Sequence, residues 1–381
     1  MKVYFDNAAT TAIDLDVFEA MKPYMLEHFG NPSSIHSHGR QVRTAIERSR
    51  KKVADLLNTS PAEIFFTSGG TEADNTAIRC SVRDRGVKHL ITSRIEHHAV
   101  THTAEALLKK GIKVSYVDLD GQGLINYDQL EELLKSNANS MVSLMHANNE
   151  IGNLLDLDRV GTMCKEHNAL FHSDTVQSMA HYTHDLSALK LDFAVGSAHK
   201  FHGPKGIGFL YMNHENKIDQ FIHGGSQERN MRGGTENVYG IVGLAKAMEI
   251  AYADMESHRK HIESLKSHMV GRLKNSIEGV AFNGLSGEVD KSLYTVLSVC
   301  LPPSDDNDML LFNLDISGIS VSGGSACSSG SSIGSHVLAE LNRDQNRGAI
   351  RFSFSKYNTL EEVDYAVDKL AQFYQPETAS A

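Results

Sequence analysis

Lys200 lies in the stretch of this sequence whose residue types most clearly suggest chemistry. Its surroundings read Ser197-Ala198-His199-Lys200-Phe201-His202-Gly203-Pro204-Lys205-Gly206-Ile207-Gly208. Apolar segments at 191–195 and 207–212 flank it and predict two buried strands. A desolvated lysine loses its proton more easily and can form a Schiff base with an aldehyde. The alternative is a structural loop whose lysine points to water, and spacing alone does not choose between Lys200 and Lys205.

A second candidate site is the run Thr67-Ser68-Gly69-Gly70-Thr71-Glu72-Ala73, which follows a predicted strand at 63–66 and opens a predicted helix. Its glycines let the backbone approach a ligand, and the amides at a helix start favour an anion such as phosphate. The run matches neither Gly-x-Gly-x-x-Gly nor the lysine-bearing P-loop, which disfavours a dinucleotide or a nucleoside triphosphate. The alternative is an ordinary threonine cap beside a glycine turn.

A third candidate, His172-Ser173-Asp174-Thr175-Val176-Gln177, ends another predicted strand. Asp174 could pair with a protonated ring nitrogen, and Gln177 could donate to a ring hydroxyl or an imine. Taken alone, an aspartate that caps the next helix is the commoner outcome. The order of the three sites within one region favours pyridoxal phosphate, because its phosphate, ring nitrogen and aldehyde need these three kinds of partner.

The elements that must position these residues alternate along the chain. Short apolar runs predict strands at 63–66, 90–92, 114–117, 141–145, 170–172, 193–196 and 208–211, with amphipathic helices at 71–85, 98–110, 127–135 and 156–167 between them. This order predicts an α/β fold with a mostly parallel sheet covered by helices on both faces. After a long helical region at about 238–277 the strands become sparser, which predicts a smaller α+β domain. We expect residues 14–255 to form the large domain and residues 1–13 with 256–381 the small one.

Bulk composition excludes several classes. The 381 residues carry 37 basic and 47 acidic side chains, a net charge of -10, which argues against nucleic acid or an anionic membrane as the main partner. The sequence has no apolar run long enough to predict a membrane-spanning helix. The four cysteines, Cys80, Cys164, Cys300 and Cys327, are far apart, so neither disulfides nor a structural zinc site is expected, and a reducing cytoplasm is the simplest location. The twenty histidines predict no metal centre.

The chain resembles the cysteine desulfurases (the NifS/IscS-like branch) of the class V aminotransferase-type enzymes almost from end to end. The motifs that carry the resemblance are Tyr4-Phe5-Asp6-Asn7-Ala8-Ala9-Thr10-Thr11, Gly30-Asn31-Pro32-Ser33-Ser34, 67–75, Glu96-His97-His98-Ala99-Val100, Asn148-Asn149-Glu150-Ile151-Gly152, the Lys200 segment, Arg232-Gly233-Gly234-Thr235-Glu236-Asn237, Ser325-Ala326-Cys327 and Arg351-Phe352-Ser353. The resemblance implies the fold type I architecture of pyridoxal phosphate enzymes.

The resemblance also implies a role for each matching position. Lys200 would hold pyridoxal phosphate covalently, His97 would stack on its ring and Asp174 would pair with its nitrogen. Asn149 and Gln177 would contact the ring oxygen, while the phosphate would be bound by Gly70, Thr71, Ser197 and His199. Thr235 would reach the phosphate of a neighbouring subunit, which implies a homodimer. Arg351, with Asn149, would bind the substrate carboxylate. Thr175 stands where the family usually has alanine and is expected to lie against the ring.

Cys327 lies among small polar residues from Ser320 to Ser332. Such a stretch cannot pack a core, so it predicts an accessible, mobile loop at about 318–335 in the small domain. Most free cysteines are buried. An accessible one suits a nucleophile, although only a few per cent is thiolate at pH 7 unless the site activates it. The alternative is an incidental surface cysteine.

Together with the resemblance, these features predict conversion of L-cysteine to L-alanine. Lys200 would move the α-proton, and Cys327 would receive the sulfur as a persulfide for an acceptor such as an iron–sulfur scaffold protein. Two other functions stay open at this point. One is another reaction of the same cofactor, such as selenocysteine lysis, transamination or β-elimination, because fold does not fix function. The other is a non-catalytic sulfur carrier or accessory protein.

Overall fold

The computed structural model describes residues 1–323, 335–341, 344 and 346–374. Its larger part is built on a seven-stranded sheet in the order β2-β8-β7-β6-β5-β3-β4. Only β8 runs antiparallel to its neighbours in this sheet. The strands are β2 (Ile64–Thr67), β3 (His89–Thr92), β4 (Lys113–Tyr116), β5 (Ser140–Ser143), β6 (Leu170–Ser173), β7 (Phe193–Ser197) and β8 (Gly208–Met212). The sheet therefore confirms the predicted α/β class.

Helices cover both faces of this sheet, as its residue alternation requires. Phe66, Ile91, Val142 and Phe171 point to one core, whereas the residues just before three of them, Phe65, Leu90 and Met141, point to the other. The first core is closed by α2 (Ser37–Leu56), α5 (Tyr127–Lys135), α6 (Leu157–Glu166) and α7 (Val238–Ala253). The second core is closed by α3 (Gly70–Asp84) and α4 (His98–Leu108). β3, β5, β6 and β7 thus bury both of their faces, which explains the continuous apolar runs in the sequence, whereas β4 at the edge of the sheet is only partly buried.

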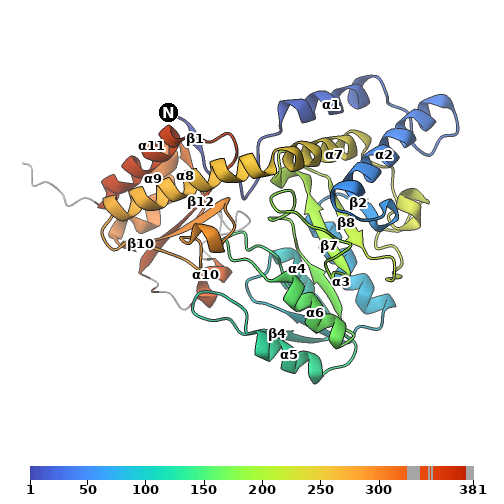
Figure 1. Ribbon diagram of the computed structural model, residues 1–381, viewed down its shortest axis with the longest axis horizontal. Coiled ribbons are helices and arrows are strands. Elements are labelled where there is room, and N and C mark those ends of the chain that lie inside the picture. Colours follow the sequence, from blue (N-terminus) through green and yellow to red (C-terminus); the bar gives the residue numbers. More distant parts are fainter. Residues whose placement is uncertain (324–334, 342–343, 345, 375–381) are drawn as a thin grey trace, which may run out of the picture.

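A third core forms around two smaller sheets. β10 (Val296–Pro303) pairs antiparallel with β9 (Ala281–Phe282) and β12 (Arg347–Ser353), and β1 (Val3–Tyr4) pairs parallel with β11 (Ile319–Ser320). α8 (Met255–Ser276) and α11 (Leu360–Ala371) pack against these strands. Figure 1 shows α7 and α8 running end to end from the large sheet toward the small one. The predicted domain limits at 13/14 and 255/256 stay a prediction.

The remaining helices lie at the edges of these cores. α1 (Leu15–Leu26) packs on α7, and α9 (Leu310–Ile316) packs beside β11. α10 (His336–Glu340) packs through Val337 and Leu338 on Ile95 and Ile151. Short 3-10 turns connect several elements, and one of them, η2 (Ala198–Lys200), directly follows β7. None of the helices in the described part of the chain combines the length and the apolar character that crossing a bilayer requires.

Candidate active site

The predicted residues gather at the carboxyl ends of the parallel strands, where ligands of such sheets bind. A cavity of about 250 Å³ lies there. Its lining includes predicted residues from strand ends, helix starts and the small sheets: Gly70, Thr71, His97, Asn149, Asp174, Gln177, Ser197, His199, Lys200 and Arg351. The fold thus brings together positions that lie up to 281 residues apart in the chain, from Gly70 to Arg351.

One end of this cavity opens into a hollow at the N-terminus of α3. Gly70, Thr71, Ser197 and His199 line both spaces. Gly70 leaves room that a side chain would fill, because a Cβ atom there would come 2.7 Å from Val176 Cγ2. Burial lowers the pKa of His199 to about 4, with help from Lys200 and Lys205, so its imidazole is neutral at pH 7. Backbone amides, a hydroxyl and a neutral imidazole make a cradle that fits a phosphate group.

The opposite end of the cavity holds two buried carboxyl groups, those of Asp174 and Asp74. Asp174, just after β6, is 5% exposed, and its Oδ1 accepts a hydrogen bond from Val176 N–H at 2.9 Å. His97 caps α4 by accepting from Ala99 N–H at 3.1 Å. Burial lowers the pKa of His97, and the charge of Asp174 opposes that effect. The arrangement suits a heteroaromatic ring that lies beside His97 and directs its nitrogen at Asp174.

Lys200 stands between these two ends because η2 turns the chain sharply after β7. Its Nζ donates hydrogen bonds to the backbone oxygens of Ala8 at 2.6 Å and Ala9 at 2.9 Å. Gln177 Nε2 also donates to the oxygen of Ala8, at 3.0 Å. Lys205 is exposed and lines only the hollow beside the phosphate cradle. The geometry therefore favours Lys200 for contact with an aldehyde in the cavity, a choice that spacing left open.

Arg351 enters the cavity from β12. It is 2% exposed, and it donates through Nη2 to Asp6 Oδ1 at 2.9 Å and through Nη1 to the backbone oxygen of Asn149 at 3.0 Å. Its Nε is buried and has no hydrogen-bond partner among the described residues. A buried guanidinium with an unused donor is suited to a carboxylate ligand.

Asp6 joins this arginine to the small sheets. Its Oδ1 also accepts from Ser322 Oγ at 2.9 Å, and Ser322 pairs through its backbone with Arg351. Asp6 lies in the first motif of the family resemblance, but no role was predicted for it. The carboxylate was not identifiable as the partner of Arg351 because 345 residues separate the two.

One predicted residue in the described part of the chain does not line this cavity. Thr235 is exposed and lines a separate pocket with Thr67, Arg232 and Glu236. Cys327 lies outside the described residues, together with most of the loop predicted at 318–335. The other three cysteines, Cys80, Cys164 and Cys300, are free and buried.

Thr175 was expected to lie against the ring, and the structure corrects this. Its side chain is fully buried away from the cavity, where Oγ1 donates to the oxygen of Val195 at 2.6 Å and accepts from Val195 N–H at 3.1 Å. The hydroxyl thereby extends the contact between β6 and β7. Val176 lines the cavity instead. The expectation was wrong by one position because the backbone bends just after the strand ends.

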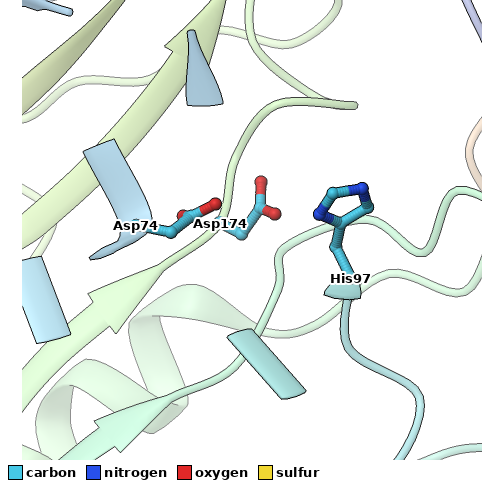
Figure 2. Close-up of side chains that lie close together, drawn as sticks. All are labelled: Asp74, His97 and Asp174. Carbon is cyan, nitrogen blue, oxygen red and sulfur yellow. The ribbon is translucent and has the colours of Figure 1, made fainter. Parts of the chain in front are cut away.

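Sequence reasoning also missed Asp74, which lies in α3 and lines the cavity. Asp74, His97 and Asp174 lie close together (Figure 2). One carboxylate oxygen of each aspartate and one ring nitrogen of the histidine all lie within 4.8 Å of one another. Helical spacing was the available signal, because a residue four positions after Gly70 shares its face of the helix.

Comparison with known proteins identifies the family to which the chain belongs. Residues 3–366 match the family model described as aminotransferase class-V. The chain is 40% identical to "Cysteine desulfurase IscS" of Dictyoglomus turgidum, over 98% of this chain and 95% of that one. It is also 40% identical to "Putative cysteine desulfurase IscS 1" of Bacillus subtilis, over 97% and 98% of the two chains.

Solved structures of similar proteins have the same fold. A "NIFS-LIKE PROTEIN" superposes with a TM-score of 0.89 at 40% identity, covering 98% of this chain and 99% of that one. A structure described as "SspA in complex with cysteine" superposes with a TM-score of 0.81 at 32% identity, covering 94% and 100%.

Proposed function

Because the chain belongs to the class-V aminotransferase family, and within it to the cysteine desulfurases, we propose that it is a pyridoxal phosphate-dependent enzyme that converts L-cysteine to L-alanine. The observation that carries this proposal is the convergence of Lys200, Asp174 and Arg351 on one cavity, in a chain that also has the Ser325-Ala326-Cys327 motif. An amine, a partner for the ring nitrogen and a carboxylate receptor are the three groups that amino-acid chemistry on this cofactor needs.

The residues present fit the cofactor. The hollow at the start of α3 would hold its phosphate, His97 and Val176 would contact its ring, and Asp174 would face the nitrogen. Bound there, pyridoxal phosphate supplies an aldehyde for the substrate's amine and a ring that accepts the electron pair released at the α-carbon. Asn149 and Gln177 would orient the ring through its oxygen.

Lys200 would both anchor the cofactor and move a proton. Its Nζ is held by the oxygens of Ala8 and Ala9 on the side of the cavity between the phosphate cradle and Asp174. When the substrate is bound, the freed amine of Lys200 would take the substrate's α-proton and return it later in the reaction. The two backbone acceptors hold the lysine in position without adding a charge.

Arg351 would orient the substrate. Its buried guanidinium can bind the α-carboxylate, with the amide of Asn149 beside it. Asp6 offsets the cost of burying the arginine and keeps it in place. The substrate's sulfur is then left at the opposite end of the molecule from the anchored carboxylate, where a second nucleophile can reach it.

Cys327 would be that nucleophile. Its thiolate would attack the substrate sulfur, a sulfur–sulfur bond would form, and the carbon–sulfur bond would break. The electron pair of the broken bond would stay on the substrate carbon, which takes up a proton and becomes the methyl group of alanine. Cys327 would be left as a persulfide, whose outer sulfur passes to an acceptor such as an iron–sulfur scaffold protein.

The test is incubation of the purified holoprotein with L-cysteine, with and without a reductant. We expect stoichiometric alanine, sulfide when the reductant is present, and a gain of one sulfur atom on the Cys327 peptide when it is absent. Cys327→Ser should keep the cofactor's visible absorbance but lose alanine formation. Full activity of Cys327→Ser would refute the assignment of the nucleophile, and no alanine from the wild-type protein would refute the proposed function.

We also infer a homodimer. Thr235 is exposed beside an open pocket rather than in the cavity, as a residue that completes a neighbouring site would be. Large apolar side chains are exposed on α1 and just after it, including Leu26 at 69%, Phe29 at 76% and Ile35 at 89%. Light scattering should give twice the 41.9 kDa of one chain. The buried free thiols of Cys80, Cys164 and Cys300 agree with a reducing compartment such as the cytoplasm.

A further inference from the structure

Asp74 is a cavity residue that neither the proposed chemistry nor the sequence motifs use. It lies in the second turn of α3, is 1% exposed and lines the cavity beside Asp174. Figure 2 shows its carboxyl group next to that of Asp174, with His97 on the far side of Asp174. Two carboxyl groups so close in a buried site cannot both be ionised at little cost.

Among the described residues, the two imidazoles nearest to Asp74 are shifted toward their neutral forms. His172, on β6, has its Nε2 3.3 Å from Asp74 Oδ1, but burial lowers the pKa of this imidazole to about 3. His97, at the start of α4, is also shifted toward its neutral form. Glu96, just before α4, is buried and adds negative charge when it ionises. Lys200 lines the cavity, but its Nζ is directed at Ala8 and Ala9.

Burial is the main reason that the pKa of Asp74 lies well above its usual value, and the charges of Asp174 and Glu96 raise it further. The hydrogen bonds point the same way. Asp74 Oδ1 and His172 Nε2 have no hydrogen-bond partner among the described residues, despite their 3.3 Å separation. An ionised carboxylate would need such donors, whereas a neutral carboxyl group needs fewer. His172 is held from its other side, where Nδ1 lies 2.8 Å from Ser143 Oγ.

We propose that Asp74 is a positioning residue that stays protonated and, as a neutral hydrogen-bond donor, holds Asp174 as the one carboxylate that faces the ring nitrogen of the cofactor. The two aspartates then carry a single negative charge, which matches the single positive charge of a protonated ring nitrogen. His172 closes the site behind Asp74 without adding charge. The inference rests on the proposed binding of pyridoxal phosphate, but not on the identity of the amino-acid substrate.

The experiment removes the donor of Asp74 and then restores it. Asp74→Ala, Asp74→Asn and Asp174→Asn are compared with Asp192→Asn, a carboxyl group of the same sheet that lies just before β7, at the opposite end of that strand from Lys200. Two quantities are measured. The first is the dissociation constant of pyridoxal phosphate for the apoprotein, and the second is the midpoint pH of the holoenzyme's visible absorbance.

We expect Asp74→Ala to raise the dissociation constant of pyridoxal phosphate roughly tenfold, because Asp174 loses a hydrogen-bond donor. The midpoint pH of the visible absorbance should rise by about half to one unit, because an Asp174 carboxylate without that donor stabilises a protonated cofactor more strongly. Asp74→Asn, which keeps a neutral donor, should restore most of both values. Asp174→Asn should weaken the cofactor more than either, and Asp192→Asn should change neither value.

The inference is overturned if Asp74→Asn is as damaging as Asp174→Asn, or lowers the midpoint pH, since Asp74 would then be ionised in the wild-type enzyme. It is also overturned if Asp74→Ala leaves both values unchanged. Should Asp74→Ala not fold, Asp74→Ser, whose shorter side chain cannot reach Asp174, replaces it. Neither measurement involves L-cysteine, so a wild-type enzyme that makes no alanine would defeat the proposed function and leave this result standing.

Discussion

At one end of the cavity, the amides of α3 and the side chains of Ser197 and His199 surround an open hollow, whereas at the other end Asp74 and Asp174 lie together in a buried corner. The open end offers neutral donors that are spread over many atoms. The buried end depends on the charge of individual side chains. Single substitutions should therefore have small effects at the first end and large effects at the second, because desolvated charges are costly to leave unpaired.

The largest effect should come from Lys200, which serves both ends. Lys200→Ala should lower alanine formation at least roughly 10³-fold, because both the covalent anchor and the proton-transfer group are lost. The visible absorbance of the bound cofactor should disappear with it. Lys205→Ala is the matched control. It should lose less than roughly tenfold, because this exposed lysine can add only a screened attraction to the phosphate. The reverse outcome for these two variants would exchange their assignments.

The next largest effect concerns the carboxylate receptor. Arg351→Lys should raise the KM for L-cysteine by roughly thirtyfold with a smaller change in kcat, because an ammonium cannot reproduce the fork that contacts Asp6 and Asn149. Asp6→Ala should raise KM by roughly tenfold, because the arginine loses its anchor. Asp16→Ala, on the exposed surface of α1, is the control for Asp6. A fall in kcat alone, with KM unchanged, would assign Arg351 to a different step.

This contrast also explains what the sequence could predict. The phosphate cradle could be read from Thr67 to Thr71, because its atoms come largely from one contiguous turn before a helix. The inner strands were predicted well because β3, β5, β6 and β7 bury both faces and so read as largely apolar runs. Helix starts, such as Asn126 before α5 and Asp156 before α6, also have ordinary capping residues.

The buried end could not be read in this way. The contacts of Asp74 with Asp174, and of Asp6 with Arg351, join residues 100 and 345 positions apart and depend on how strands and helices pack. The Thr175 expectation failed for a local reason, since the direction of a side chain beyond a strand end depends on a bend that composition does not reveal. The roles of Lys200, Asp174, Arg351 and Cys327 rest on the family resemblance and await the experiments above.

A substitution at the open end can test whether shape matters there more than charge. Gly70→Ala places a methyl group 2.7 Å from Val176 Cγ2, so the Val176 side chain or the start of α3 must shift. We expect roughly tenfold weaker cofactor binding and a loss of about 1–3 kcal/mol in the free energy of unfolding. Gly271→Ala, on α8 with open space around it, should be neutral or slightly stabilising. Equal behaviour of the two variants would show that the cradle tolerates a side chain.

The buried end should also make the apoprotein sensitive to acid. His172 has a pKa of about 3 in the fold, against about 6.5 when unfolded, so the unfolded chain binds its proton first as pH falls. The stability contributed by the neutral imidazole is complete above pH 6.5 and is lost toward pH 3, at about 1.4 kcal/mol per pH unit. Urea unfolding of wild-type protein and His172→Gln should show their stability difference shrinking by about 2 kcal/mol between pH 7 and pH 5. A constant difference would mean that folding does not shift the pKa of His172, and a difference that grows toward pH 5 would mean that His172 is protonated in the fold.

The smallest effect should come from Ser197, at the open end. Ser197→Ala removes one neutral hydroxyl from a cradle whose other donors include the amides at the start of α3, so we expect pyridoxal phosphate to bind about three- to tenfold more weakly. The midpoint pH of the visible absorbance should not move, because no charge near the ring nitrogen changes. Asp174→Asn, measured in the same titration, should change both quantities. If Ser197→Ala weakened binding a hundredfold or shifted the midpoint, the two ends would be electrostatically coupled, and the cavity would have to be treated as one charged site rather than as two.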